Sequence, residues 1–436
     1  MQSGGSNSNK AYGNKKKTRK PKRETVGLES QDVEEVVDLD LEESESVSSD
    51  LLTFTSENAP KSIGDITAIL DQQKPDPKRV AKRKSIASLS PPDTENKKKL
   101  VKFYLKRGKA ASRVGKTLQQ IEDFKKAEQI SRTAKSLKLR IEALKRLSGA
   151  QFLAGNWGAS IKIRQKILKI FERKKIGRNA VRWRAILVSD YARMGKFAAA
   201  EKQMRLIEQR LKNFPKKANW QRDKQKIQAM ASRAKANLLD SQRKFQKAEN
   251  LYKSSLSFLQ AATSGKESLI LRDSIKAELA NNLMHQGRWI EAEIQAREAL
   301  INSLSRAGKY STETTANLLL MADVIGGQGR FKDAIILSEA AVEILKSLGL
   351  GNDVLPLNRA QKILAIAYFN SGDIEKSLKI FDEIEIAIGS RKKRFDAILV
   401  RDITWHLAML LGDRHEKALP LLKRAVELRR KGRKGG

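Results

Sequence analysis

The side chains that could carry catalysis or bind a metal are few and scattered in this sequence. The three histidines, His285, His406 and His415, are not clustered, whereas a metal site needs several ligands close together. The chain has no cysteine, which excludes disulfides, thiolate zinc sites and a thiol nucleophile. No serine or carboxylate lies in a motif for nucleophilic or acid–base chemistry. We therefore expect a protein that is not an enzyme and carries no cofactor or metal.

One glycine-rich segment superficially resembles a phosphate-binding loop. It is the run Gly326-Gly327-Gln328-Gly329. A phosphate-binding loop follows a strand and continues into Lys-Ser or Lys-Thr, and this run does neither. We interpret it as a turn between two helices.

That turn is one of a series in the repeat region, which begins near residue 97. Each turn usually has a glycine followed two residues later by an aromatic residue, and a small residue often follows three positions after that, with a period of about 42 residues. The turns begin at Gly115, Gly155, Gly195, Arg243, Gly287, Gly329, Gly372 and Asp413. Glycine tolerates the left-handed conformation that ends a helix, and we expect the aromatic residue to lie between two helices while the small residue lets their backbones approach.

The apolar residues between these turns recur at helical spacing. The sequence predicts an all-α fold, a right-handed α-solenoid of about eight helix pairs. The predicted pairs are 97–114/117–134, 136–154/157–173, 178–194/197–213, 219–241/245–262, 267–286/289–306, 311–328/331–348, 355–370/374–389 and 392–411/415–430.

The chain before the repeats has a different composition. We expect residues 1–60 to form a disordered charged tail that is basic over 10–24 and acidic over 25–60. This segment lacks the periodic apolar residues that a core would need. We expect residues 61–96 to form a transition segment between the tail and the repeats. It should contain a short helix near 62–70, stopped by Pro75 and Pro77, and a hinge at 88–92. The repeats then occupy 97–430, and 431–436 form a basic C-terminal tail.

The formal net charge of +37 makes an acidic partner the expected kind of partner. No run of 18 or more apolar residues and no secretory signal are present, so we expect a cytoplasmic protein without a membrane span. The basic run 15–23 is also typical of nuclear import, which makes a eukaryotic nucleus the alternative location.

The turns resemble those of the tetratricopeptide repeat (TPR) in its longer, kinesin-light-chain-like form, over residues 97–430. The segments 61–77, 103–108 and 308–314 are also similar to the repeat half of bacterial proteins that end in a CHAT peptidase domain. That peptidase needs a Cys–His pair, and this chain has no cysteine. The resemblance therefore implies the repeat half without the enzyme.

In such an array the first helix of each pair lines the concave groove. The side chains that map to the groove are Lys145, Arg182, Arg193, Arg233, Asn237, Asn281, His285, Arg359, Lys362 and Asn370. Arg233 and Asn237 stand at i and i+4, so both could hold a carboxylate, which resembles part of the carboxylate clamp of some TPR domains. Glu278 stands where that clamp would have a neutral amide, and the alternative is that all ten are ordinary solvated residues.

These observations predict a non-catalytic scaffold or adaptor that binds an extended, acidic peptide or protein in a basic groove. One alternative is a nucleic-acid-binding repeat protein, which the charge favours but the sparse aromatic residues do not. The other is the regulatory repeat half of a CHAT-type protease system.

Overall fold

The computed structural model describes residues 62–389 except 74–76, 176, 217, 262–265 and 352–353, and also 416, 419, 420 and 423. Within this part every regular element is a helix. The predicted tails lie outside the described residues, as does the eighth helix pair apart from those last four positions. The division of the chain into tail, transition and repeat array therefore stays a prediction.

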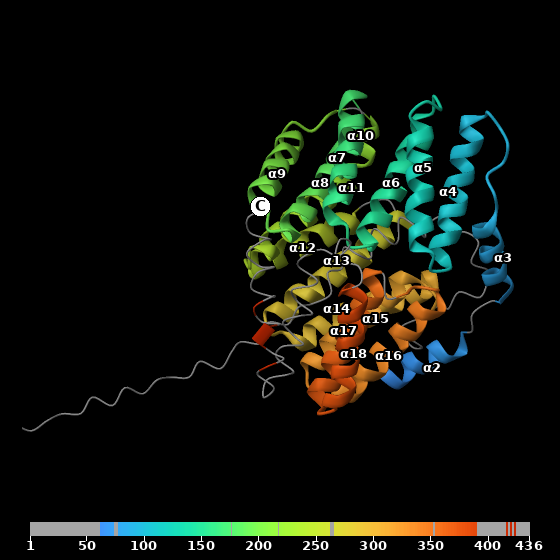
Figure 1. Ribbon diagram of the computed structural model, residues 1–436. Coiled ribbons are helices and arrows are strands. Elements are labelled where there is room, and N and C mark those ends of the chain that lie inside the picture. Colours follow the sequence, from blue (N-terminus) through green and yellow to red (C-terminus); the bar gives the residue numbers. More distant parts are fainter. Residues whose placement is uncertain are drawn as a thin grey trace, which may run out of the picture.

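The described helices are joined mostly by short turns and pack in antiparallel pairs (Figure 1). They are α2 (Ile63–Gln72), α3 (Pro77–Ser88), α4 (Lys97–Arg113), α5 (Thr117–Ser131), α6 (Leu137–Leu153), α7 (Trp157–Arg173), α8 (Gly177–Arg193), α9 (Phe197–Lys212), α10 (Ala218–Arg222), α11 (Lys224–Ser241), α12 (Phe245–Gln260), α13 (Lys266–His285), α14 (Trp289–Ala307), α15 (Thr312–Gly327), α16 (Phe331–Ser347), α17 (Leu355–Ser371) and α18 (Ile374–Gly389). The expected all-α solenoid is confirmed. None of the described helices has the length and apolar character needed to cross a membrane.

The turn within each described pair has the predicted chemistry. The residue that begins each turn has a positive φ, including Arg243 at 61°, where the other turns have glycine. The small residues after the turns are completely or almost completely buried, at Ser160, Ala200, Ala248, Ala292, Ala334 and Ser377. The turns thus bring the two helices of a pair into close contact, as the sequence predicted.

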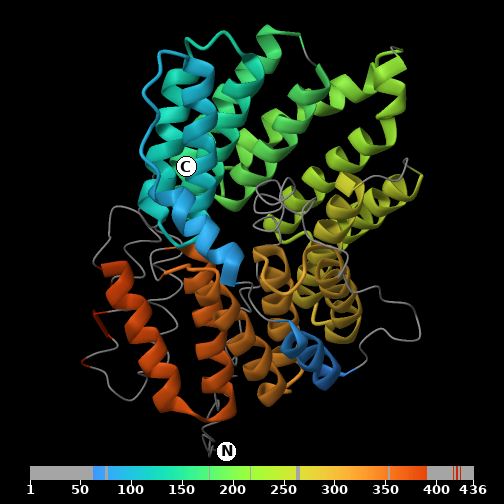
Figure 2. The ribbon, with the colours of Figure 1, turned by 90° about the vertical axis from the view of Figure 1, so that its right-hand side faces the viewer.

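The array curves so that its first pair meets its sixth and seventh pairs (Figure 2). Gly115, in the α4–α5 turn, and Gly349, after α16, lie backbone against backbone. A Cβ atom on Gly115 would overlap the carbonyl oxygen of Gly349, and both residues have a positive φ, 72° and 80°. We call this contact the seam. It closes the described repeats into a ring.

The segment before the repeats holds the ring together on one side. Helix α2 buries Ile63, Ile66 and Leu70 in the same apolar cluster as α14 to α16. After α2, the Gln73 side-chain oxygen accepts a 2.6 Å hydrogen bond from the backbone N–H of Lys309. Helix α3 then packs against α4. Helix α2 and Gln73 therefore contact the fifth and sixth pairs, and helix α3 contacts the first pair.

The sequence interpretation of this segment needs one correction. The short helix near 62–70 is present as α2, with Ser62 and Asp65 forming a capping box. Pro77, however, does more than stop this helix. It is the first residue of α3, where a proline lacks only an N–H that has no intrahelical partner in any case. The charged residues of α3 hid this helix from the apolar-period criterion.

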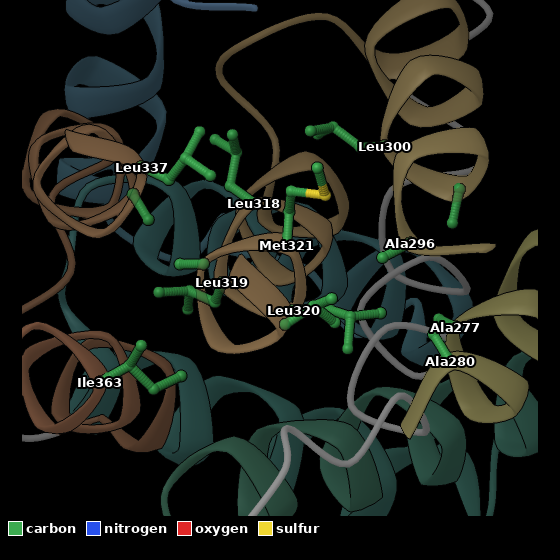
Figure 3. Close-up of a cluster of buried hydrophobic side chains, with 14 of the residues drawn as sticks. Ala277, Ala280, Ala296, Leu300, Leu318, Leu319, Leu320, Met321, Leu337 and Ile363 are labelled. Carbon is green, nitrogen blue, oxygen red and sulfur yellow. The ribbon is translucent and has the colours of Figure 1, made fainter. Parts of the chain in front are cut away.

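The core is continuous in the second half of the array. Buried side chains of α11 to α17 and α2 form one cluster, centred on α15, whose Leu318, Leu319, Leu320 and Met321 are each at most 3% exposed (Figure 3). Helix α15 is buried almost all round because neighbouring helices cover it on most sides. In the first half the buried side chains fall into separate clusters, over α4 to α8 and over α8 to α11.

Candidate functional site

The first helices of the second, third and fourth pairs surround a hollow, which we call the basic hollow. It encloses about 880 Å³ of space, part of it open to solvent. Its lining comes from α6, α7, α8 and α11: Glu142, Lys145, Arg146, Ser148, Gly149, Phe152, Arg164, Arg182, Trp183, Ala185, Ile186, Ser189, Asp190, Arg193, Met230, Arg233 and Ala234. On α6 and α8 these residues recur at spacings of three and four, so each helix presents one face to the hollow.

Positive charge dominates the described lining. Six of the lining side chains are Lys or Arg, and two are carboxylates. The carboxylate of Glu142 accepts a 2.6 Å hydrogen bond from Arg146, and that of Asp190 accepts one from Arg164. Because both carboxylates already hold arginines of the lining, the lining as a whole keeps an excess of positive charge. The arrangement favours an anionic occupant.

An aromatic floor lies beneath part of this charge. The guanidinium of Arg193 lies 5.1 Å from the centre of the Phe152 ring, and that of Arg164 lies 5.3 Å from it. Phe152 in turn stacks on Trp157, with ring centres 5.9 Å apart. Such cation–π contacts hold a guanidinium in a fixed orientation.

Arg233 and Asn237 hold a carboxylate, and it belongs to the protein itself. Nε and Nη2 of Arg233 each donate a 2.8 Å hydrogen bond to Glu278, which is 5% exposed. Nδ2 of Asn237 donates to the same carboxylate at 3.2 Å. The expectation that this pair stands ready for a ligand carboxylate is therefore corrected. The residue that seemed out of place for a clamp, Glu278 of α13, is the group that they bind.

Asn237 is also fixed from its other side. The hydroxyl of Tyr252 donates a 2.6 Å hydrogen bond to its Oδ1, and Nδ2 of Asn237 donates to Oγ of Ser189 at 3.0 Å. Burial, together with the nearby carboxylates of Asp240 and Glu278, raises the pKa of Tyr252 well above its usual value, so the hydroxyl remains a donor. This network ties α8, α11, α12 and α13 together behind the basic hollow.

The structure brings four of the ten predicted groove residues into the basic hollow: Lys145, Arg182, Arg193 and Arg233. The others lie elsewhere. Asn281 is buried and donates to a carbonyl of its own helix at 3.1 Å, and His285 is exposed, 3.7 Å from Asp240. Asn237 lies behind the hollow in the network described above, and Arg359, Lys362 and Asn370 lie on α17, outside the lining of the hollow.

Sequence reasoning missed three lining residues that shape the site: Arg146, Phe152 and Arg164. Phe152 follows Lys145 by seven residues and Arg146 follows Glu142 by four, which is helical spacing along α6, and this signal was available in the sequence. Arg164 belongs to α7, a second helix, which the rule about first helices leaves out. Among the described residues, no group of three or more His, Asp or Glu side chains is placed to hold a metal ion.

Comparison with known proteins agrees with this architecture. No protein-family model and no curated protein matches the sequence. Among solved structures, a Rap protein complexed with competence and sporulation factor superposes with a TM-score of 0.54 at 12% identity, over 93% of this chain and 99% of that one. The fold is thus that of a TPR-type α-solenoid.

Two further solved structures are similar at lower scores. A putative kinesin light chain with TPR-like repeats from Podosopora anserina has a TM-score of 0.37 at 17% identity, over 46% of this chain and 94% of that one. A signal transduction ATPase with a tetratricopeptide repeat sensor from Pyrococcus horikoshii has a TM-score of 0.44 at 13% identity, over 91% of this chain and 69% of that one. The similarity to CHAT-linked repeats stays a prediction.

Proposed function

We propose that this protein is a binding scaffold whose basic hollow holds an extended acidic segment of a partner protein. The observation that carries the proposal is the meeting of Lys145, Arg182 and Arg193, from two consecutive first helices, in one hollow with an excess of positive charge. Arginine donors in a fixed orientation suit carboxylates, because a guanidinium can donate two parallel hydrogen bonds to one carboxylate.

The hollow is prepared before a partner arrives. Arg193 rests on Phe152 at 5.1 Å, and the Arg233–Glu278 pair fixes α11 against α13. A preformed site loses little conformational entropy on binding, and the surrounding positive charge accelerates the encounter with an acidic partner. The Rap structure was solved with a bound factor, which supports a binding function for an array of this shape.

The proposal is tested by reversing charge inside and outside the hollow. The double variant R182E/R193E places two carboxylates in the lining. Its matched control, K162E/K166E, makes the same change in net charge at exposed lysines on α7 that do not line the hollow. Partners would be captured from a lysate of the source cells with each protein, and the affinity for the purified partner would be measured by fluorescence anisotropy.

We expect R182E/R193E to weaken partner binding roughly a hundredfold, since like charges placed together at an interface cost several kcal/mol. The control should bind within a few-fold of the wild type. Equal loss in both variants would show that only the overall charge matters and would contradict the hollow as the binding site.

The net charge also favours nucleic acid as a competing class of partner. The same two variants separate the possibilities when they are assayed with duplex DNA and RNA at about 50 and 200 mM salt. A binding constant that falls steeply with salt, and falls equally in both variants, would favour nucleic acid bound over a broad surface.

A further inference from the structure

A second hollow lies at the seam. It shares Arg146 with the basic hollow, and its other lining residues are different. It encloses about 710 Å³, part of it open to solvent, and its lining comes from the first, second, sixth and seventh pairs. We call it the seam hollow. It is lined by Lys109, Ser112, Arg113, Thr117, Gln120, Phe124, Arg146, Leu153, Thr312, Leu348, Leu350, Val354 and Pro356.

The charged side chains that line the seam hollow are all cationic. They are Lys109, Arg113 and Arg146, and no Asp or Glu occurs among the described lining residues, although Arg146 also donates to Glu142 in the lining of the basic hollow. Burial and the neighbouring charge of Arg146 lower the pKa of Arg113 to about 10. A lowered arginine pKa means that the site would gain free energy from an added negative charge.

The helix ends at the seam add to this preference. Thr117 and Thr312 are the first residues of α5 and α15, and Val354 is the N-cap of α17. The N-terminal turn of a helix carries partial positive charge and backbone N–H groups without intrahelical acceptors. Three such ends therefore border the same hollow as the three cations.

A buried side chain points independently to a missing acceptor. Gln120 is only 4% exposed, and its Nε2 finds no hydrogen-bond acceptor among the described residues. Leaving such a donor unsatisfied costs roughly 1–3 kcal/mol, so an acceptor in the hollow would be stabilising. Gln120 lies in the first turn of α5, beside Thr117.

Much of the remaining lining is apolar. Phe124 and Leu153 come from the first two pairs, and Leu348, Leu350 and Pro356 come from the segment around the start of α17. A simple inorganic anion would leave these apolar groups unused. A hollow that combines polar donors with apolar groups is typical of a site for a small organic molecule.

We propose that the seam hollow binds a small organic phosphate, with its phosphate groups at Lys109, Arg113, Arg146 and Gln120 and an apolar or aromatic body against the leucines and Pro356. Phosphate oxygens supply several strong acceptors, which match the number of donors. Because the lining belongs to both sides of the seam, the bound molecule would also hold the ring closed.

The test uses ADP and inorganic pyrophosphate as probes, titrated calorimetrically into the full chain. We expect both to bind, and ADP to bind more tightly because its base can pack against the apolar side chains of the lining. Lys109→Met should weaken ADP binding roughly tenfold or more, as expected for the loss of a charged hydrogen bond. Lys106→Met, at an exposed lysine on the same helix outside the hollow, should leave it unchanged.

Gln120→Leu separates a ligand contact from a structural role. It removes an unsatisfied buried donor, so thermal unfolding of the ligand-free protein should occur at the same temperature or higher, whereas ADP binding should weaken. Unchanged ADP binding in Q120L, equal losses in K109M and K106M, or no saturable binding of either probe would overturn the proposal. Pyrophosphate binding without tighter ADP binding would overturn its assignment to an organic phosphate.

Discussion

The two halves of the array solve the packing problem differently. From α11 to α17 one apolar cluster runs through successive pairs without a break. From α4 to α11 the apolar residues form separate clusters, and arginine–carboxylate pairs such as Arg164–Asp190 are buried beside them. Both hollows take their cations from this first half. The first half of the array therefore lacks a continuous core and carries the charged, concave surface.

The comparison suggests a division of labour. A continuous apolar core couples neighbouring repeats strongly, because the stability of a repeat array includes the interfaces between its units. Buried ion pairs are weaker evidence of stability, since desolvation offsets their attraction, but they fix side chains in defined positions. Buried ion pairs occur in both halves, as at Arg164–Asp190 and Arg306–Asp273, so the halves differ in the continuous core of the second and in the hollow-lining cations of the first.

The largest effect should follow from breaking the buried pair behind the basic hollow. Glu278→Ala leaves Arg233 buried without its bidentate partner, and the loss of one partner of a buried pair costs about 3–5 kcal/mol. Urea unfolding followed by circular dichroism would measure the change in the free energy of unfolding.

The double variant R233M/E278L is the control, because an apolar replacement of both partners is often close to neutral. If E278A and the double variant lose the same stability, the packing of these positions matters rather than their charge, and the contrast between the halves weakens.

A core substitution in the second half should cost somewhat less but affect more of the array. Leu318, at the centre of α15, is fully buried, and Leu318→Ala should lower the free energy of unfolding by roughly 3 kcal/mol. Ile336→Ala on α16, at a side chain that is 43% exposed, should change it little. Hydrogen exchange would check that L318A raises the opening rates from α13 to α17; a response confined to α15 would contradict a continuous core.

A smaller, pH-dependent effect is expected where the halves join, at Glu249 of α12. Burial alone would raise the pKa of Glu249, but hydrogen bonds from Lys253, Gln286 and Arg288 outweigh it and lower the pKa to about 2, from an ordinary value of 4.5. The native state therefore gains stability above pH 4.5, on the order of 2–3 kcal/mol, and loses it as the pH falls from about 4.5 to 2.

Thermal unfolding measured from pH 7 to pH 3 would show this loss. Glu249→Gln should be less stable at neutral pH and should show a shallower decline over the same interval. An unchanged slope in E249Q would mean that other carboxylates govern the acid sensitivity.

Most of the fold was predictable because its determinants are local. Gly155 and Gly195 each follow the first helix of a pair, at the same place in the period. The buried Ala200 and Ala248 mark where the two helices of a pair touch. The same local reasoning placed Lys145, Arg182 and Arg193 on a common face, and the structure puts them in one hollow.

The other features depend on contacts between residues of different helix pairs, and the repeat period does not specify which residues meet. The partner of Arg233 is Glu278, in the next helix pair, and the choice between an internal and an external carboxylate depends on how two pairs are oriented. The seam depends on the small rotation of each helix pair relative to the one before it. The sequence near Gly115 or Gly349 therefore does not indicate that these two residues meet. Pro77 is likewise the first residue of a helix, and this role can be recognised only once α3 is known.

The contact between Gly115 and Gly349 has a consequence for how this chain can evolve. An open solenoid can gain or lose a unit by duplication or deletion, because each unit touches only its neighbours. Here, one unit more or fewer between the two glycines would carry them past each other and separate the walls of the seam hollow. We therefore expect the number of units between them to be constrained, and sequence change to occur by substitution within units rather than by a change in their number.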